Sequence, residues 1–130
     1  CIKTSEAVRI CMEEGVSMEQ ITMSSDGNGS MSVPLPDGGA KLLVTRLSSL
    51  HEEVRDAVKA GVPVEKAIRI CGENPARANG LFPKKGCIRP GSDADLVILD
   101  EEFLVDTVFA RGQKMVEYGK ALVKGTFETD

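Results

Sequence analysis

The spacing of apolar residues changes early in the chain. Val8, Cys11 and Met12 recur at helical intervals, and Gly15 suits the left-handed position at which a helix stops. The next apolar run, Ile-Thr-Met-Ser-Ser at residues 21–25, is short, β-branched and alternating, which predicts a strand. A glycine-rich turn follows this run, so the first elements expected are a helix, a strand and a tight turn.

The middle of the chain is predicted to be a long loop followed by helices. Residues 31–46 contain two prolines and an Asp-Gly-Gly run, which favour a surface loop. Ser49 and Glu52 have the spacing of a capping box at the start of a helix with one apolar face. Two shorter helices follow, and the second is expected to open with Asn74 as its cap and Pro75 in the first helical position.

Around residue 81 the apolar period becomes that of strands. Four short runs with glycine-containing turns predict a small antiparallel sheet, at residues 94–100, 105–110, 114–117 and 121–123. The single strand of the first half would need parallel neighbours, and the later strands would need a second layer on one face. We therefore expect the end of a larger α/β protein, as the start at Cys1 without an initiator methionine also indicates.

The composition excludes several classes of function. Hydrophobic residues make up 42% and charged residues 28% of the chain, which is typical of a soluble globular protein. The net charge of −4 and the scarcity of aromatic residues argue against a nucleic-acid partner. No apolar run reaches the roughly 18 residues that a membrane helix needs. The four cysteines form no Cys-x-x-Cys pair, so we expect free thiols in a cytoplasmic protein.

Asp26 has the clearest catalytic potential of any residue in the sequence. It follows the predicted strand and begins a turn with two glycines. In a βα barrel, the strand ends hold the catalytic groups, and a carboxylate there can bind a metal and move a proton. Aspartate before glycine is also common in ordinary tight turns, so the pattern alone leaves a structural role open.

Three runs of the chain carry a resemblance to one known family. They are Ile-Thr-Met-Ser-Ser-Asp-Gly-Asn-Gly-Ser at 21–30, Lys-Gly-Cys-Ile-Arg-Pro-Gly-Ser-Asp-Ala-Asp-Leu-Val-Ile at 85–98, and Gly-Lys-Ala-Leu-Val-Lys-Gly-Thr-Phe-Glu at 119–128. The second run resembles the closing motif of the amidohydrolase superfamily. The first and third resemble the isoaspartyl (β-aspartyl) dipeptidases within that superfamily.

The resemblance implies a fold and an activity. The chain would be the C-terminal piece of a (β/α)8 TIM-like metallo-dependent hydrolase barrel, followed by strands of a small β-sandwich. Residues 1–80 would be the last part of the catalytic α/β barrel, with strand eight near 20–26, and residues 81–130 would belong to the sandwich. The complete protein would be a cytoplasmic, homo-oligomeric zinc peptidase that hydrolyses β-aspartyl dipeptides.

The resemblance also implies roles for residues of the turn. Asp26 matches the aspartate that binds the more exposed ion of a binuclear zinc centre, accepts a proton from the metal-bound hydroxide and protonates the leaving amine. Ser30 matches a serine that helps to hold the α-carboxylate or α-amino end of the dipeptide. Gly27 and Gly29 would let the backbone approach the substrate closely.

Most of the metal ligands that the resemblance requires are missing from this sequence. Such a centre needs several imidazoles, whereas the only histidine, His51, lies in the first turn of the predicted capped helix and matches none of them. We expect His51 to be an exposed helix residue, and Asp93 and Asp95 to set a turn and fix the start of a strand. This chain alone is expected to bind zinc weakly and to hydrolyse nothing.

Two other functions remain open at this point. A different amidohydrolase, such as a deacetylase or a cyclic amidase, would carry the same closing motif, although the Ser-Ser-Asp-Gly-Asn-Gly-Ser sequence around Asp26 is narrower than a general strand-end aspartate. The chain could also be a non-catalytic interaction module that derives from a decayed hydrolase, an alternative that the start at Cys1 disfavours.

Overall fold

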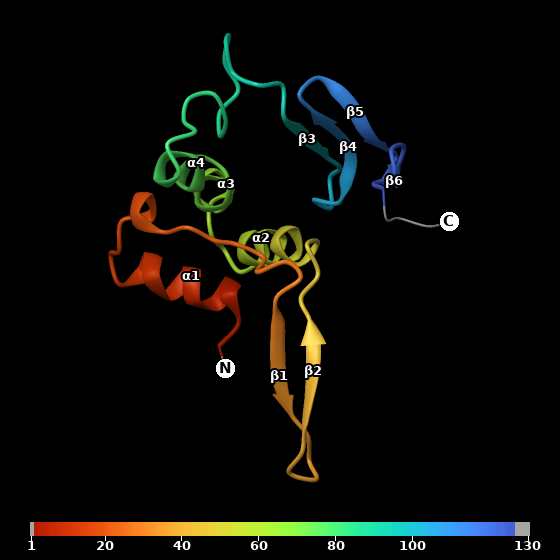
Figure 1. Ribbon diagram of the computed structural model, residues 1–130. Helices are drawn as coiled ribbons and strands as arrows, with labels where there is room; N and C mark the ends of the chain where they lie inside the picture. The colour runs from red at the N-terminus through yellow and green to blue at the C-terminus, as the bar shows by residue number, and fades with distance from the viewer. Residues whose placement is uncertain (1, 127–130) are drawn as a thin grey trace.

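The computed structural model describes residues 2–126, in which a helical part and an antiparallel sheet are joined by a loop (Figure 1). The elements are α1 (Thr4–Glu13), the 3-10 helix η1 (Met18–Gln20), β1 (Ser30–Pro34), β2 (Ala40–Val44), α2 (Ser49–Lys59), α3 (Val64–Cys71), α4 (Glu73–Ala78), β3 (Leu96–Leu99), β4 (Val105–Ala110), β5 (Gln113–Glu117) and β6 (Lys120–Ala121). Three residues named in the sequence analysis, at the chain start and in the run 119–128, lie outside the described residues: Cys1, Phe127 and Glu128. Within the described part, no helix is both long and apolar enough to cross a membrane.

The hydrophobic core lies among α1, α2, α3 and the segment that precedes β1. Apolar side chains three and four positions apart share one face of each helix, and these faces meet, with α1 packed on α2 and α2 on α3. The buried apolar residues of this core are Val8, Met18, Met23, Val54, Ala57, Val62, Ala67 and Ile70. The helical part of the chain thus holds the segment that leads to Asp26.

Asn74 ties this segment to the helices. Its side chain is 4% exposed, and its Nδ2 donates hydrogen bonds to Met18 O at 2.7 Å and to Ile21 O at 2.6 Å. The prediction that Asn74 caps a helix is wrong, because α4 already begins at Glu73 and the amide is occupied by these two carbonyls. Pro75 is therefore the third residue of the helix rather than the first.

The strand predicted at residues 21–25 is not formed within the described chain, whereas a strand eight near 20–26 of a complete barrel stays a prediction. Ile21 has an extended backbone, with φ −99° and ψ 132°. However, a strand needs a ladder of hydrogen bonds to a neighbour, and among residues 2–126 no strand pairs with this segment. The amide of Met23 donates instead to Ile70 O of α3, at 2.8 Å.

The prediction of a surface loop at residues 31–46 is also wrong, because the segment forms a β-hairpin. β1 and β2 pair in antiparallel register, with Ser30 opposite Val44 at the base. Pro34 is tolerated because it ends an edge strand, where its missing N–H interrupts no ladder. Figure 1 shows the hairpin projecting away from the helices.

The start of α2 also differs from its prediction. Ser48 precedes the helix, and Ser49, the expected cap, is its first residue. Neither serine accepts a hydrogen bond from a helix amide: the Ser49 hydroxyl donates to Arg46 O at 2.7 Å, and the Ser48 hydroxyl donates to Glu52 at 3.3 Å. The expected capping box is therefore replaced by contacts that close the turn before the helix.

His51 connects the helical part to the sheet. It is half-buried rather than exposed, and its Nε2 lies 2.8 Å from Phe103 O in the turn between β3 and β4. The prediction of an exposed helix residue is wrong because the sheet folds back against the first turn of α2.

The second half of the chain forms the predicted antiparallel sheet, in the order β3-β4-β5-β6. The turns at Arg111-Gly112 and Tyr118-Gly119 contain glycine, as expected, and have positive φ at both positions, as type I′ hairpin turns require. The last strand is shorter than expected, since it covers Lys120–Ala121. Val97 is 58% and Ile98 49% exposed, so the described residues provide no complete second layer for this sheet.

Candidate active site

The turn at Asp26 is encoded by its own residues. The amide of Gly29 donates to Asp26 O at 2.8 Å, and the amide of Gly27 donates to the Ser25 hydroxyl at 3.2 Å. Asp26 and Asn28 have positive φ values of 46° and 65°. Aspartate and asparagine tolerate this region better than other non-glycine residues, so the local sequence suits the turn.

Thr45, which directly follows the hairpin, closes the other side of the turn. Its amide donates to Gly29 O at 2.9 Å, and its carbonyl accepts from the amide of Asn28 at 3.0 Å. Its hydroxyl donates to Asp26 O and lies 3.0 Å from Gly29 O. Sequence reasoning missed Thr45, because these partners are 16 and 19 positions away and only a recognised hairpin would have brought them together.

The Asp26 carboxylate is exposed and lies over Gly29. A Cβ atom on Gly29 would lie 2.5 Å from Asp26 Oδ2 and 2.7 Å from Oδ1, which is far inside van der Waals contact. Among residues 2–126, the carboxylate has no hydrogen-bond or ion-pair partner. It is therefore free to accept a proton or to bind a cation.

Gly27 and Ser30 complete the predicted site. A Cβ atom on Gly27 would overlap the exposed Leu47 side chain, which would have to shift to make room for it. Ser30 is exposed at the start of β1, opposite Val44. The structure thus brings the predicted residues together in one exposed turn, and the substrate contacts of Ser30 and the two glycines stay predictions.

Asp26 lacks fellow metal ligands in the described chain. Over residues 2–126, no group of three or more His, Cys, Asp or Glu side chains is placed to hold a metal ion. His51 is engaged with Phe103 O instead. The residues present therefore do not fit a binuclear centre, and Asp26 could be one ligand only of a site completed by other residues.

The two aspartates of the closing motif have the structural role predicted for them. Lys85 Nζ lies 3.0 Å from Asp93 Oδ2 and also pairs with Asp95, whose Oδ1 accepts a hydrogen bond from the amide of Arg111 at 2.7 Å. The hydrogen bond from Lys85 lowers the pKa of Asp95, and the same bond raises the pKa of Lys85. This network fixes the loop before β3 to the turn after β4.

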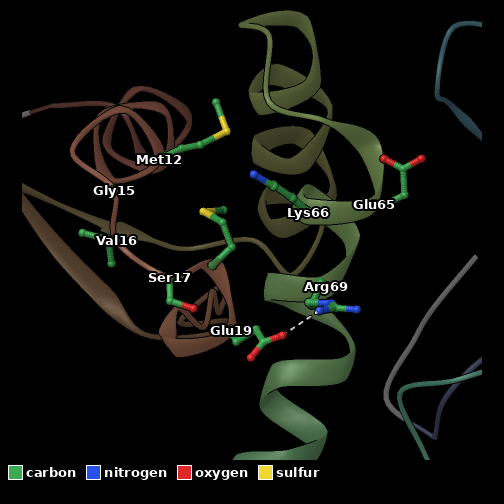
Figure 2. A pocket seen from close by; sticks show the side chains of 9 residues that line it. Met12, Gly15, Val16, Ser17, Glu19, Glu65, Lys66 and Arg69 are labelled. Atoms are coloured by element: carbon green, nitrogen blue, oxygen red, sulfur yellow. Dashed lines mark hydrogen bonds and ion pairs between the residues drawn. The ribbon is translucent and has the colours of Figure 1, made fainter.

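Two cavities lie away from the Asp26 turn. One, of about 530 Å³, lies between the end of α1 and α3, and Glu19 pairs there with Arg69 at 3.2 Å (Figure 2). The other, of about 560 Å³, lies between the helices α2 to α4 and β3. Neither is lined by Asp26 or Ser30, so neither cavity holds a substrate against the Asp26 turn.

Comparison with known proteins identifies the family. The model of the amidohydrolase family matches residues 2–121. This chain belongs to the amidohydrolase family, and its described residues are a mixed α/β piece of that fold, with small antiparallel sheets and no closed barrel among them.

Several curated proteins are similar in sequence. The chain is 31% identical to adenine deaminase 2 of Jannaschia sp. (strain CCS1) over 132 residues, which cover 92% of this chain and 21% of the relative. It is 44% identical to D-hydantoinase of Streptomyces coelicolor over 55 residues, 42% of this chain and 11% of the relative. The chain thus spans about a fifth or less of the length of these relatives.

Two solved structures are similar to most of the chain. A β-aspartyl dipeptidase of Fervidobacterium islandicum AW-1, solved in complex with the β-Asp-Leu dipeptide, matches with a TM-score of 0.79 and 30% identity, over 96% of this chain and 33% of that one. An N-acetylglucosamine-6-phosphate deacetylase of Pasteurella multocida matches with a TM-score of 0.63 and 20% identity, over 85% of this chain and 34% of that one. The second match shows a shared fold alone.

Proposed function

We propose that the complete protein hydrolyses the isopeptide bond of β-aspartyl dipeptides, and that this chain is the C-terminal portion of that enzyme. The observation that carries the proposal is the exposed Asp26 carboxylate, which has no partner among residues 2–126, in a chain that matches a β-aspartyl dipeptidase over 96% of its length. In the complete protein, we propose, the extended segment before Asp26 joins a (β/α)8 barrel and residues 81–130 join a β-sandwich.

Asp26 is proposed to move the proton during hydrolysis. Its carboxylate accepts a proton from the attacking water while the water oxygen bonds to the carbonyl carbon of the β-aspartyl amide. It then gives this proton to the amine nitrogen as the carbon–nitrogen bond breaks. The hydroxyl of the water thereby becomes part of the new carboxyl group, and its other proton ends on the amino group of the released amino acid. A carboxylate without a partner among residues 2–126 is suited to both steps.

Ser30 is proposed to hold one end of the dipeptide. It lies on the same turn as Asp26, and its exposed position at the start of β1 leaves the hydroxyl open to a ligand. A hydroxyl can donate to an α-carboxylate or accept from an α-ammonium group, so it fits either end of the substrate.

A binuclear zinc centre is proposed for the complete protein, with ligands that residues 2–126 do not supply. Such a centre would make hydroxide available near neutral pH and polarise the scissile carbonyl. Because Asp26 has no fellow ligands in the described chain, we expect the isolated chain to bind zinc weakly and to hydrolyse nothing. Two tightly bound zinc ions per isolated chain would contradict this expectation.

A second candidate is hydrolysis at a ring carbon, as in a cyclic amidase or an adenine deaminase. The sequence matches to an adenine deaminase over 92% of this chain and to a D-hydantoinase over 42% favour it. A proton-transferring carboxylate at Asp26 would serve these reactions as well, so the Asp26 turn alone does not separate the candidates.

The substrates separate the two candidates directly. The complete protein, expressed from the gene with its upstream sequence and supplied with zinc, is assayed against β-Asp-Leu, α-Asp-Leu, a 5-substituted hydantoin and adenine. Release of leucine from the β-linked peptide alone is the expected result, with a raised KM in the Ser30→Ala variant. Turnover of hydantoin or adenine in place of the dipeptide would overturn the proposal, and turnover of none would favour a non-catalytic module.

A further inference from the structure

The hydroxyl of Thr45 bonds to the backbone of the Asp26 turn, although Thr45 is far from this turn in the sequence. The half-buried Thr45 side chain places its single hydroxyl proton between two carbonyl oxygens, those of Asp26 and Gly29. These are the residues at the two ends of the turn that carries the carboxylate. One hydroxyl therefore bridges both ends of the turn.

Bonds from outside the turn add to the local stabilisation of the Asp26 backbone. Its φ of 46° lies in the left-handed region, which aspartate tolerates better than most residues but still occupies at some energetic cost. The carboxylate is carried by this backbone and has no partner of its own among the described residues. The position of the carboxylate therefore depends on the bonds made to the turn beneath it.

The β1–β2 hairpin brings Thr45 next to the Asp26 turn. Thr45 follows the last residue of β2, and the pairing of Ser30 with Val44 brings the two ends of the hairpin together at its base. Leu47, two positions further on, fills the space beside Gly27. The chain leaving the hairpin thus contacts the turn at both of its glycines, with Thr45 at Gly29 and Leu47 at Gly27.

We infer that Thr45 is a positioning residue for Asp26, which acts by holding the backbone of the turn through its hydroxyl. The inference rests on the proposed role of Asp26 as the proton-transferring group. Thr45 itself does not contact the substrate. It affects catalysis only by fixing the position of the Asp26 carboxylate.

The variants Thr45→Val and Thr45→Ser distinguish the effect of the hydroxyl from the effect of the side-chain shape. Valine keeps the branched shape and both backbone hydrogen bonds, whereas serine keeps the hydroxyl. In the complete protein with β-Asp-Leu, we expect Thr45→Val to lower kcat by roughly tenfold or more with KM within about twofold, because small displacements of a catalytic group lower the rate steeply. Thr45→Ser should stay within about threefold of the wild type.

Thr107→Val is the matched control, since it removes the hydroxyl of a second threonine, in β4, whose partner is the Asp106 side chain at 2.8 Å. It should leave kcat unchanged. A wild-type kcat in Thr45→Val, or an equal loss in Thr45→Val and Thr45→Ser, would overturn the inference.

Hydrogen exchange of the Asn28 and Gly29 amides tests the same inference without activity. These amides bond to Thr45 O and Asp26 O, so both should exchange faster in Thr45→Val than in the wild type and in Thr45→Ser. Unchanged exchange would show that the hydroxyl does not hold the turn. An inactive wild type would overturn the proposed function, and the exchange rates would still decide whether Thr45 restrains the turn.

Discussion

The Asp26 carboxylate occupies the space that a side chain on Gly29 would fill. The resemblance implied that this glycine lets the backbone approach a substrate, but the structure gives a reason that applies before any substrate binds. The distances of 2.5 and 2.7 Å from a Cβ atom to the two carboxylate oxygens leave no room for even a methyl group. At this position, glycine is therefore a condition for the observed orientation of Asp26.

Gly29→Ala should accordingly displace the carboxylate and lower kcat toward the β-linked dipeptide by roughly a hundredfold, the order expected when a catalytic group moves by about 1 Å. Gly39→Ala, at the hairpin tip, is the matched control, because its Cβ atom would lie 3.1 Å from the Asp37 carboxylate but far along the chain from Asp26. Steady-state kinetics of both variants would check this. Equal activities of the two variants would mean that the Asp26 orientation is not the one used in catalysis.

Which single residues could be predicted depended on how far away their partners lie in the chain. The Asp26 turn was predictable because Ser25, Gly27 and Asn28 encode it within a few positions. Thr45 and His51 were not, because their partners are up to 19 and 52 positions away and no local pattern marks such contacts.

At the scale of elements, the segment before Asp26 is held by a helix rather than by a sheet. Asn74 satisfies the carbonyls of Met18 and Ile21 from the first turn of α4, in a nearly solvent-free environment. Buried carbonyls left without a donor are destabilising, so the Asn74 side chain stabilises the segment that leads to the Asp26 turn.

Asn74→Ala should destabilise the protein by about 2 kcal/mol or more, because it leaves two carbonyls unsatisfied at about 1–3 kcal/mol each. Asn79→Ala removes an exposed amide that donates to Pro75 O at 2.8 Å, and should cost less than about 0.5 kcal/mol. The thermal unfolding midpoints of the complete protein in both variants are the measurement. A loss in Asn74→Ala no larger than in Asn79→Ala would exclude the anchoring role.

The contribution of the Lys85, Asp93 and Asp95 network to stability should depend on pH. Because the folded-state pKa of Asp95 is lowered, chiefly by Lys85, its carboxylate stabilises the fold above its ordinary pKa of about 3.9, and this stabilisation is lost as the pH falls through the lowered value. Asp95→Asn should therefore unfold at a lower temperature than the wild type at pH 7, and the difference should vanish well below pH 4. A difference that stays constant down to pH 2 would contradict this assignment.

The elements themselves were predictable where the pattern was strong and the partners were near. The four helices and the antiparallel sheet follow from apolar spacing and from the glycine turns at Gly112 and Gly119. The hairpin was missed because prolines and the Asp-Gly-Gly run are as typical of loops as of a hairpin tip. The segment at residues 21–25 does not form the predicted strand within the described chain, because a ladder depends on neighbours as well as on its own residues.

At the scale of the whole molecule, apolar surface is left open. Leu42 and Val44 are 67% and 65% exposed, and because they lie two positions apart on β2 they share one side of the hairpin. A two-stranded hairpin is marginally stable alone and has two unpaired edges. The described chain therefore exposes surface of the kind that folded proteins usually cover.

We expect the isolated chain to self-associate, with an average mass by light scattering that rises with concentration. Replacing both Leu42 and Val44 with serine should reduce this rise, whereas Ile88→Ser, which changes a single 86% exposed residue away from the hairpin, should not. A monodisperse monomer of the unmodified chain would contradict the expectation.

The central proposal joins all three scales: the helices and the hairpin hold the Asp26 turn, and we propose that this turn presents the Asp26 carboxylate to a β-aspartyl peptide bond in the complete protein. The most direct measurement is the rate of leucine release from β-Asp-Leu by the complete protein and by its Asp26→Asn variant, with thermal unfolding midpoints as a check on folding. Loss of a proton-transferring group predicts a fall in kcat of about two to four orders of magnitude with an unchanged midpoint. A folded Asp26→Asn variant that keeps kcat within about tenfold of the wild type would contradict the claim.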